Sequence, residues 1–180
     1  MIELEDGTIL LPLVEIHTFS GQLPYLQYYQ RLRVSTHVTL SHDGGHTWTP
    51  FEALSFHGQS PSLLQTQGGV LLCAYRQRGP RKPQGVGLSY SCNGGERWAE
   101  TDQLYLAPED FWDCAYPNLI ELSPGEYIAV YYTAALGTQF KDPPPASVRY
   151  ADADNTIELL RFREHSERQT ASPLDHDAQS

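Results

Sequence analysis

The sequence lacks the signals of helices, and it carries few charges. Charged residues make up 19% of the 180 residues and hydrophobic residues 40%, a composition typical of a globular protein. Glycine (14 residues) and proline (13 residues) are frequent, and β-branched and aromatic residues cluster in short runs between them. This pattern is typical of many short strands, so it predicts an all-β fold.

An excess of positive charge is also missing. The formal net charge is −10 at pH 7. Nucleic acids and anionic membrane surfaces require a basic face, so we expect neither of them as a partner. No apolar run approaches the roughly 18 residues that a membrane-spanning helix needs, and the sequence therefore predicts no such helix.

Metal-binding and targeting motifs are absent as well. The three cysteines (Cys73, Cys92 and Cys114) have no metal-like spacing, and the seven histidines form no H-E-x-x-H pattern. We expect free thiols, no metal and no cofactor. Residues 1–6 have neither a basic start nor an apolar centre, so no signal peptide is predicted. A cytoplasmic location is expected unless the N-terminus is truncated.

What the sequence does contain is a motif that occurs twice. Residues 41–48 read SHDGGHTW and residues 91–98 read SCNGGERW, 50 residues further along the chain. We call these segments the first and the second clamp. A repeat at such a spacing indicates an architecture of repeated units.

Each residue type in the motif suits a tight turn between two antiparallel strands. The Asp or Asn side chain can bond to its own backbone, the glycines can adopt positive φ, and the tryptophan buries a large apolar surface. We therefore predict a structural role for Ser41, Asp43, Gly45 and Trp48 in the first clamp, and for Ser91, Asn93, Gly95 and Trp98 in the second.

A second repeat runs alongside the clamps. Gly7, Gly69 and Gly125 each lie before an apolar strand, with spacings of 62 and 56 residues, and they mark three units. The predicted strands, four in each unit, are 1–5, 8–16, 31–40 and 47–56, then 61–67, 70–77, 85–91 and 97–106, then 115–122, 126–133, 146–151 and 156–163. Four-stranded antiparallel units at this spacing are typical of β-propeller blades.

The predicted domain organisation is a partial β-propeller over residues 1–163, followed by a disordered polar tail over 164–180. The units span about 1–57, 58–108 and 109–163. In the third unit the position expected for a clamp, near Ser147, has neither paired glycines nor tryptophan. Propellers close with about 4 to 8 blades. Three units therefore require either a missing half of the propeller or self-association of the chain.

The two clamps resemble the Asp-box, or BNR repeat, of the sialidase (neuraminidase) superfamily. The resemblance covers residues 1 to about 163, and it implies a six-bladed propeller of which this chain looks like the C-terminal half. In that family the Asp-boxes lie on the outer rim, away from the active site. Related propellers also include non-catalytic glycan binders and assembly factors, so the motif implies the fold more firmly than the activity.

The third unit carries a sharper resemblance. The segment Tyr116-Pro117-Asn118-Leu119 is similar to the strand that bears the catalytic tyrosine of sialidases, although Pro117 replaces the common serine. The resemblance implies that Tyr116 is the nucleophile of an exo-α-sialidase. A neutral phenol suits this reaction because a carboxylate nucleophile would be repelled by the substrate carboxylate. Asp113 is the best nearby carboxylate for acid–base catalysis.

The resemblance also implies arginines that hold the substrate carboxylate, in a bidentate geometry that lysine cannot copy. Arg76 and Arg78 follow a strand similar to one that ends in arginine in the family, whereas Gln59-Ser60-Pro61 lacks the arginine expected there. Tyr131 and Tyr132 are further candidates for substrate contact. The expected ligand is a glycan or sialoside.

Two other functions remain open from the sequence. One is a non-catalytic carbohydrate-binding propeller in which aromatic side chains stack on sugar rings. The aromatic residues concerned are Tyr25, Tyr28, Trp112, Tyr116 and Tyr131. The other is a purely structural or interaction module.

Overall fold

The computed structural model describes residues 1–17, 33–54, 56–77, 85–106, 111–136 and 153–163. These residues form eleven strands in three antiparallel sheets, and the described part of the chain contains no helix. The all-β prediction is therefore confirmed.

Each sheet is built from consecutive strands. The first sheet contains β1 (Ile2–Glu3), β2 (Ile9–His17), β3 (Arg33–Ser41) and β4 (Glu52–Ala53). The second contains β5 (Gly58–Gln65), β6 (Leu71–Gln77), β7 (Gly85–Ser91) and β8 (Ala99–Leu106). The third contains β9 (Phe111–Ser123), β10 (Glu126–Leu136) and β11 (Ala153–Arg163).

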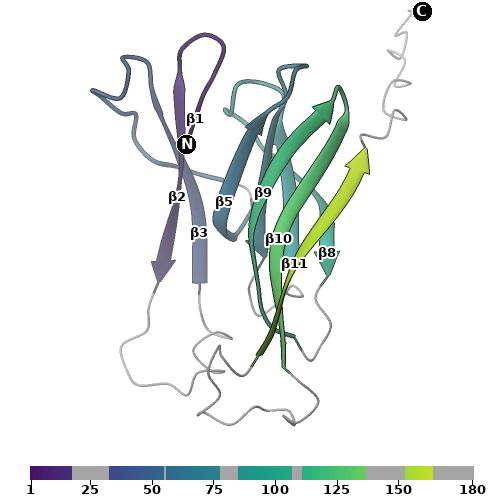
Figure 1. Ribbon diagram of the computed structural model, residues 1–180. Coiled ribbons are helices and arrows are strands. Elements are labelled where there is room, and N and C mark those ends of the chain that lie inside the picture. Colours follow the sequence, from purple (N-terminus) through teal and green to yellow (C-terminus); the bar gives the residue numbers. More distant parts are fainter. Residues whose placement is uncertain (18–32, 55, 78–84, 107–110, 137–152, 164–180) are drawn as a thin grey trace, which may run out of the picture.

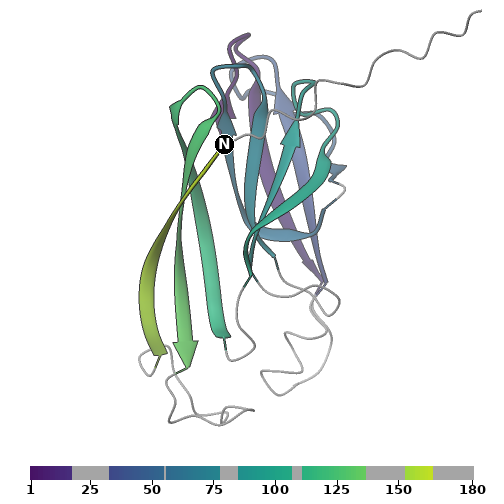
Figure 2. The ribbon, with the colours of Figure 1, turned by 90° about the vertical axis from the view of Figure 1, so that its right-hand side faces the viewer.

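The second sheet lies between the other two, and Figures 1 and 2 show the three sheets side by side in chain order. All seven residues of β6 are buried. Leu71, Cys73 and Tyr75 join an apolar cluster with residues of the first sheet, whereas Leu72 and Ala74 join a cluster with residues of the third. Because successive side chains of a strand point to opposite faces, one strand contributes to both cores.

The predicted third unit needs a correction. The strand predicted at 156–163 as the fourth strand is the third, because β11 pairs directly with β10. The strand predicted at 146–151 and the tail at 164–180 lie outside the described residues. The third sheet thus has three described strands. In the first sheet, the strand predicted at 47–56 is reduced to the two residues of β4.

The register also moves the expected clamp position in the third unit. Ser41 pairs with Ile9, two residues after Gly7, and Ser91 occupies the corresponding place in the second sheet. In the third sheet the corresponding residue is Phe162, paired with Tyr127. The position predicted near Ser147 was wrong, because it follows the spacing of the second unit, in which the connection between the second and third strands (78–84) is shorter than that between β10 and β11 (137–152).

The first clamp is held by side-chain hydrogen bonds of Ser41, Asp43 and Trp48. Ser41 Oγ donates to Asp43 Oδ1 (2.8 Å) and accepts from the Gly45 N–H (2.8 Å). The Thr47 N–H donates to Asp43 Oδ1 (2.8 Å), and Trp48 Nε1 donates to the Gly45 carbonyl (3.1 Å). The turn between β3 and β4 is thus fixed by its own side chains.

The second clamp repeats these bonds with asparagine in place of aspartate. Ser91 Oγ donates to Asn93 Oδ1 (2.9 Å) and accepts from the Gly95 N–H (3.0 Å). The Arg97 N–H donates to Asn93 Oδ1 (3.0 Å), and Trp98 Nε1 donates to the Gly95 carbonyl (2.8 Å). The two turns therefore share one set of local hydrogen bonds.

The two clamps differ in their surroundings. Trp98 is 8% exposed and meets the Phe56 ring edge-on at 6.2 Å between centroids, at the junction of the first and second sheets. Trp48, at the same place in the first sheet, is 39% exposed. Trp98 of the second clamp therefore also packs in the contact between the first and second sheets.

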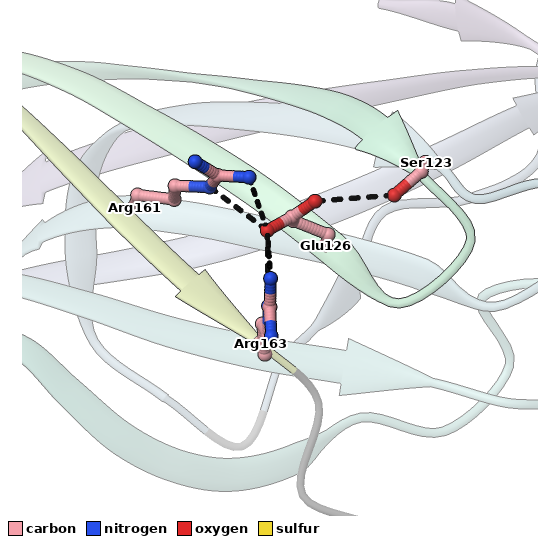
Figure 3. A network of polar contacts seen from close by, with 4 residues as sticks. All are labelled: Ser123, Glu126, Arg161 and Arg163. Carbon is pink, nitrogen blue, oxygen red and sulfur yellow. Dashed lines mark hydrogen bonds and ion pairs between the residues drawn. The ribbon is translucent and has the colours of Figure 1, made fainter.

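An ion-pair network ties β10 to β11 at the clamp end of the third sheet (Figure 3). Glu126 Oε1 accepts from Arg161 Nε (2.8 Å) and Arg163 Nε (2.9 Å), and Ser123 Oγ donates to Glu126 Oε2 (3.2 Å). Hydrogen bonds from Arg163 and then Arg161 hold the pKa of Glu126 below its usual range. The network joins the end of β11 to the start of β10.

We predict that Gly95→Ala destabilises the fold more than Gly45→Ala. Both glycines have positive φ (94° and 90°), which costs alanine about 1–2 kcal/mol. A Cβ on Gly95 would also lie 2.6 Å from Leu10 Cδ1, whereas one on Gly45 meets only ordinary contacts. The overpacking adds about 1–3 kcal/mol. Urea unfolding of both variants tests this, and equal losses would contradict it.

The first clamp should make stability depend on pH in acid. Hydrogen bonds from the Thr47 side chain, its backbone N–H and the Ser41 hydroxyl lower the pKa of Asp43 from 3.8 to about 2. The folded state favours the ionised carboxylate of Asp43. Its contribution to the free energy of unfolding is therefore complete above about pH 4 and is lost as the pH falls towards 2. Asn93 shows that asparagine can fill this position without titrating. We expect the melting temperature of Asp43→Asn to fall less than that of the wild type between pH 4 and pH 2.5. Parallel falls would argue against this role of Asp43.

Candidate active site

The candidate site lies at the end of the sheets opposite the clamps. There β5 and β9 begin and β6 and β10 end. β5 and β9 lie next to each other across the junction of the second and third sheets, and Ser62 Oγ donates to Asn118 Oδ1 at 3.2 Å. The site therefore draws residues from two adjacent sheets.

Two equivalent bulges shape this end. Ser60 in β5 and Tyr116 in β9 have φ of +49° and +48°, and both precede a proline. The ladder to the neighbouring strand is irregular at both places. Positive φ is unusual for a residue with a bulky side chain. A following proline also disfavours the right-handed α-helical region for the residue before it. Such strain is typical of functional sites, where the surrounding structure holds it in place.

The Tyr116 ring is the centre of a small aromatic and cationic group. The side chain is 61% exposed, although it is large and apolar. It stacks on Tyr132 from β10, with ring centroids 5.8 Å apart and an interplanar angle of 24°. Arg76 Cζ lies 5.8 Å from the centroid of the same ring, within the range of a cation–π interaction.

Arg76 occupies an unusual place for a cation. It is buried near the end of β6 and lies on the face of the second sheet that meets the third. The residues before it on that face, Leu72 and Ala74, belong to the apolar core. A buried guanidinium costs free energy that an apolar side chain would not cost.

The other predicted site residues fall in different places. Tyr131 is buried in the core between the second and third sheets, so the predicted contact with substrate does not suit it. Asp113 is part of β9 opposite Ala134, but its side chain is not among those described, and the same holds for the side chain of Trp112. Arg78, Tyr25 and Tyr28 lie outside the described residues.

Ser60 is a feature of the site that the resemblance to sialidases did not point to. In the sequence it stands out only as the place where an arginine is absent. The signal was nevertheless available, because Ser60-Pro61 and Tyr116-Pro117 are 56 residues apart, the same spacing that separates Gly69 from Gly125. That spacing places the two bulges at equivalent positions of two units.

The described residues hold neither a metal site nor a membrane-spanning helix. No group of three or more His, Cys, Asp or Glu side chains in this part of the chain is placed to hold a metal ion. No helix there is long and apolar enough to span a membrane. Cys73 is buried with a free thiol, and burial raises its pKa, whereas the Cys92 thiol is free and exposed.

Comparisons with known proteins identify the fold. No protein-family model matches the sequence, and neither does any curated protein. Among solved structures, a xylan β-1,4-xylosidase from Bacillus halodurans C-125 is similar, with a TM-score of 0.57 and 15% identity over 90% of this chain. The Hadza microbial sialidase Hz136 is similar with a TM-score of 0.51 and 13% identity over 91% of this chain.

The three sheets are β-propeller blades. Both similar structures have propeller-type folds, and the sheet order of this chain agrees with that architecture. The chain spans 29% of the length of the xylosidase and 32% of that of the sialidase. At these identities the likeness shows the fold, which the chain shares with two glycoside hydrolases.

Because the backbone at Tyr116 is strained, we predict that glycine at this position gives a more stable protein than alanine, the reverse of the usual order. In an ordinary strand position, alanine is more stabilising than glycine. At φ of +48° alanine keeps a left-handed penalty of about 1–2 kcal/mol that glycine avoids. We expect Tyr116→Gly to unfold at a higher urea concentration than Tyr116→Ala. Ile120, an exposed residue of the same strand, is the control, and its two variants should show the ordinary order. The ordinary order at Tyr116 would contradict the strained conformation.

Proposed function

We propose that this chain carries part of the active site of a sialidase-like glycoside hydrolase, and that its clamps are Asp-boxes of BNR repeats. The observation that carries the proposal is the pairing of Tyr116 with Arg76 across two blades, 5.8 Å from Cζ to the ring centroid. The resemblance of Tyr116-Pro117-Asn118-Leu119 to the strand with the catalytic tyrosine, and the propeller fold shared with a sialidase, support the same function.

In the proposed reaction Tyr116 is the nucleophile. Its phenolic oxygen attacks the anomeric carbon of a terminal sialic acid, and the bond to the leaving group breaks. An acid protonates the departing oxygen. A base takes the phenolic proton, and water then hydrolyses the aryl glycoside to regenerate the tyrosine. Asp113, three residues before Tyr116, is the proposed acid–base residue.

Arg76 has the proposed role of binding the substrate carboxylate. Its guanidinium can form two parallel hydrogen bonds to one carboxylate, and burial strengthens such bonds by excluding water. A carboxylate held beside the Tyr116 ring places the anomeric carbon of a sialic acid near the phenol, because in sialic acids the carboxylate is attached to the anomeric carbon. Arg78 is proposed as a second cation. Tyr132, stacked on Tyr116, holds the ring in position.

A second function is favoured by one feature, the stacking of the exposed Tyr116 ring on the partly buried Tyr132 ring. Tyr116 and Tyr132 present an aromatic surface on which a sugar ring could pack without any reaction. A carbohydrate-binding propeller would therefore use the same residues. Hydrolysis of a sialoside distinguishes the enzyme from the carbohydrate-binding propeller. Glycan binding distinguishes both of these from an interaction module.

The proposal predicts different kinetic losses for two variants with a fluorogenic sialoside. Tyr116→Phe should lower kcat by several orders of magnitude, because it removes the nucleophile. Arg76→Lys keeps the charge but loses the bidentate contact, and it should raise KM by about 10- to 100-fold, since a charged hydrogen bond contributes about 1.5–3 kcal/mol.

Tyr131→Phe is the matched control, because it removes the same hydroxyl from the neighbouring core tyrosine, and it should leave turnover unchanged. If the full chain binds sialosides on a glycan array but shows no turnover, the carbohydrate-binding function replaces the enzymatic one. If it binds no glycan and shows no turnover, both are excluded for this chain.

A further inference from the structure

Ser60 and Arg76 occupy the positions in the second sheet that Tyr116 and Tyr132 occupy in the third. Arg76 pairs with the residue just before Ser60, and Tyr132 pairs with the residue just before Tyr116. The ladder shifts register directly after each of these pairings. The backbone is bent in the same way at the two bulges, with φ of +49° at Ser60 and +48° at Tyr116. The two sheets therefore present two equivalent pairs of side chains at this end.

The equivalence indicates where the half-buried Ser60 side chain lies. The Tyr116 ring stacks on Tyr132 with centroids 5.8 Å apart, so its side chain extends from the bulge towards that residue. The backbone fixes the direction of the Cα–Cβ bond, and the backbone and the pairing are the same at Ser60. We therefore expect the Ser60 hydroxyl to lie beside the Arg76 guanidinium.

The two pairs adjoin across the junction of the second and third sheets. Arg76 Cζ lies 5.8 Å from the centroid of the Tyr116 ring. Two residues further along each strand, Ser62 Oγ donates to Asn118 Oδ1 at 3.2 Å, and these residues are also at equivalent positions. This bond holds the starts of β5 and β9 side by side. Ser60 and Tyr116 therefore approach the same guanidinium from two strands.

The two bulges differ in the side chain that they present. In the third sheet the bulge carries an aromatic ring that covers part of its partner Tyr132, whereas in the second sheet it carries only a hydroxymethyl group. A serine is too small to cover Arg76 as a ring would. Its O–H can instead donate to an anion that the guanidinium binds. Positive φ at a residue with a side chain costs stability, and such residues cluster where ligands bind.

We propose that Ser60 is a further binding residue of the candidate site, and that its hydroxyl donates a hydrogen bond to the substrate carboxylate held by Arg76. The identity of the substrate rests on the proposed function, which makes it a sugar with its carboxylate on the anomeric carbon. The contact itself does not depend on the reaction, because the carboxylate is bound in the same way with or without turnover. Ser60 thus contributes to the preference for acidic over neutral sugars.

The test compares two ligands of the full chain, an S-linked sialoside that resists hydrolysis and its methyl ester, by isothermal titration calorimetry. The ester keeps the sugar but loses the negative charge, so the ratio of the two dissociation constants reports recognition of the carboxylate. The wild type should bind the acid more tightly. Ser60→Ala should weaken binding of the acid by about 10-fold or more, as expected for a hydrogen bond to a charged group, and should leave binding of the ester nearly unchanged.

Two further variants separate the hydroxyl from the strained backbone. Ser60→Gly also removes the hydroxyl, but glycine adopts the positive φ without strain. It should lose the preference for the acid to the same extent as Ser60→Ala, while it unfolds at a higher urea concentration. Ser62→Ala is the matched control, because it removes the same hydroxyl from the same strand, and it should keep the ratio of the wild type.

Three results would overturn the role of Ser60. The first is a wild-type ratio in Ser60→Ala. The second is an equal loss of acid and ester binding in that variant, which would indicate damage to the site instead of a lost contact with the carboxylate. The third is a loss in Ser60→Ala that Ser60→Gly does not share, because strain would then be responsible.

Failure of the proposed function has a different signature. Turnover that survives in Tyr116→Phe would contradict the nucleophile and leave the effect of Ser60 on the ratio intact. A wild-type chain that binds acid and ester equally would exclude recognition of the carboxylate by Arg76 and Ser60 together. A chain that binds neither ligand would overturn both proposals.

Discussion

The rest of the structure depends on the burial of both faces of β6. Alternate side chains of this strand enter the two apolar clusters that join the second sheet to its neighbours. Because the strand has no solvent face, each position along it is assigned to one of two junctions. Arg76 is charged, unlike the apolar residues of these clusters, but it follows the same alternation and lies on the face of β6 that meets the third sheet. The same packing that stabilises the blades thus brings a buried cation to the ring of Tyr116.

The sequence was sufficient to predict the fold where local residues determine it. The clamps form because serine, aspartate or asparagine, and glycine bond within eight residues, and this needs no information from the rest of the chain. The failure came in the third unit, where β11 begins at Ala153. Periodicity places strands, but it does not say which strand pairs with which when a connection lengthens. The third strand was therefore assigned to the wrong place, and the expected clamp position moved with it.

The site could be predicted only in part, because it depends on contacts between sheets. Tyr116 and Arg76 were selected from a resemblance to sialidases, and nothing in the sequence fixes the distance between them. Tyr131 and Tyr132 are adjacent, so a strand must send them to opposite faces, and the sequence alone did not say which enters the core. The sequence also did not predict the positive φ of Ser60 and Tyr116. A proline following each residue was visible, but a bulge becomes evident only in the ladder to the next strand.

The proposed nucleophile is the central claim, and the most direct measurement is the site of covalent attachment. A fluorinated sialoside with a good leaving group forms the glycosyl–enzyme bond quickly and hydrolyses it slowly, because fluorine destabilises the positively charged transition state of both steps. Peptide mapping by mass spectrometry then locates the sugar. We predict a single adduct on Tyr116 that is absent from Tyr116→Phe. An adduct on another residue, or rapid turnover of an ordinary sialoside with no adduct on Tyr116, would contradict the assignment of this residue.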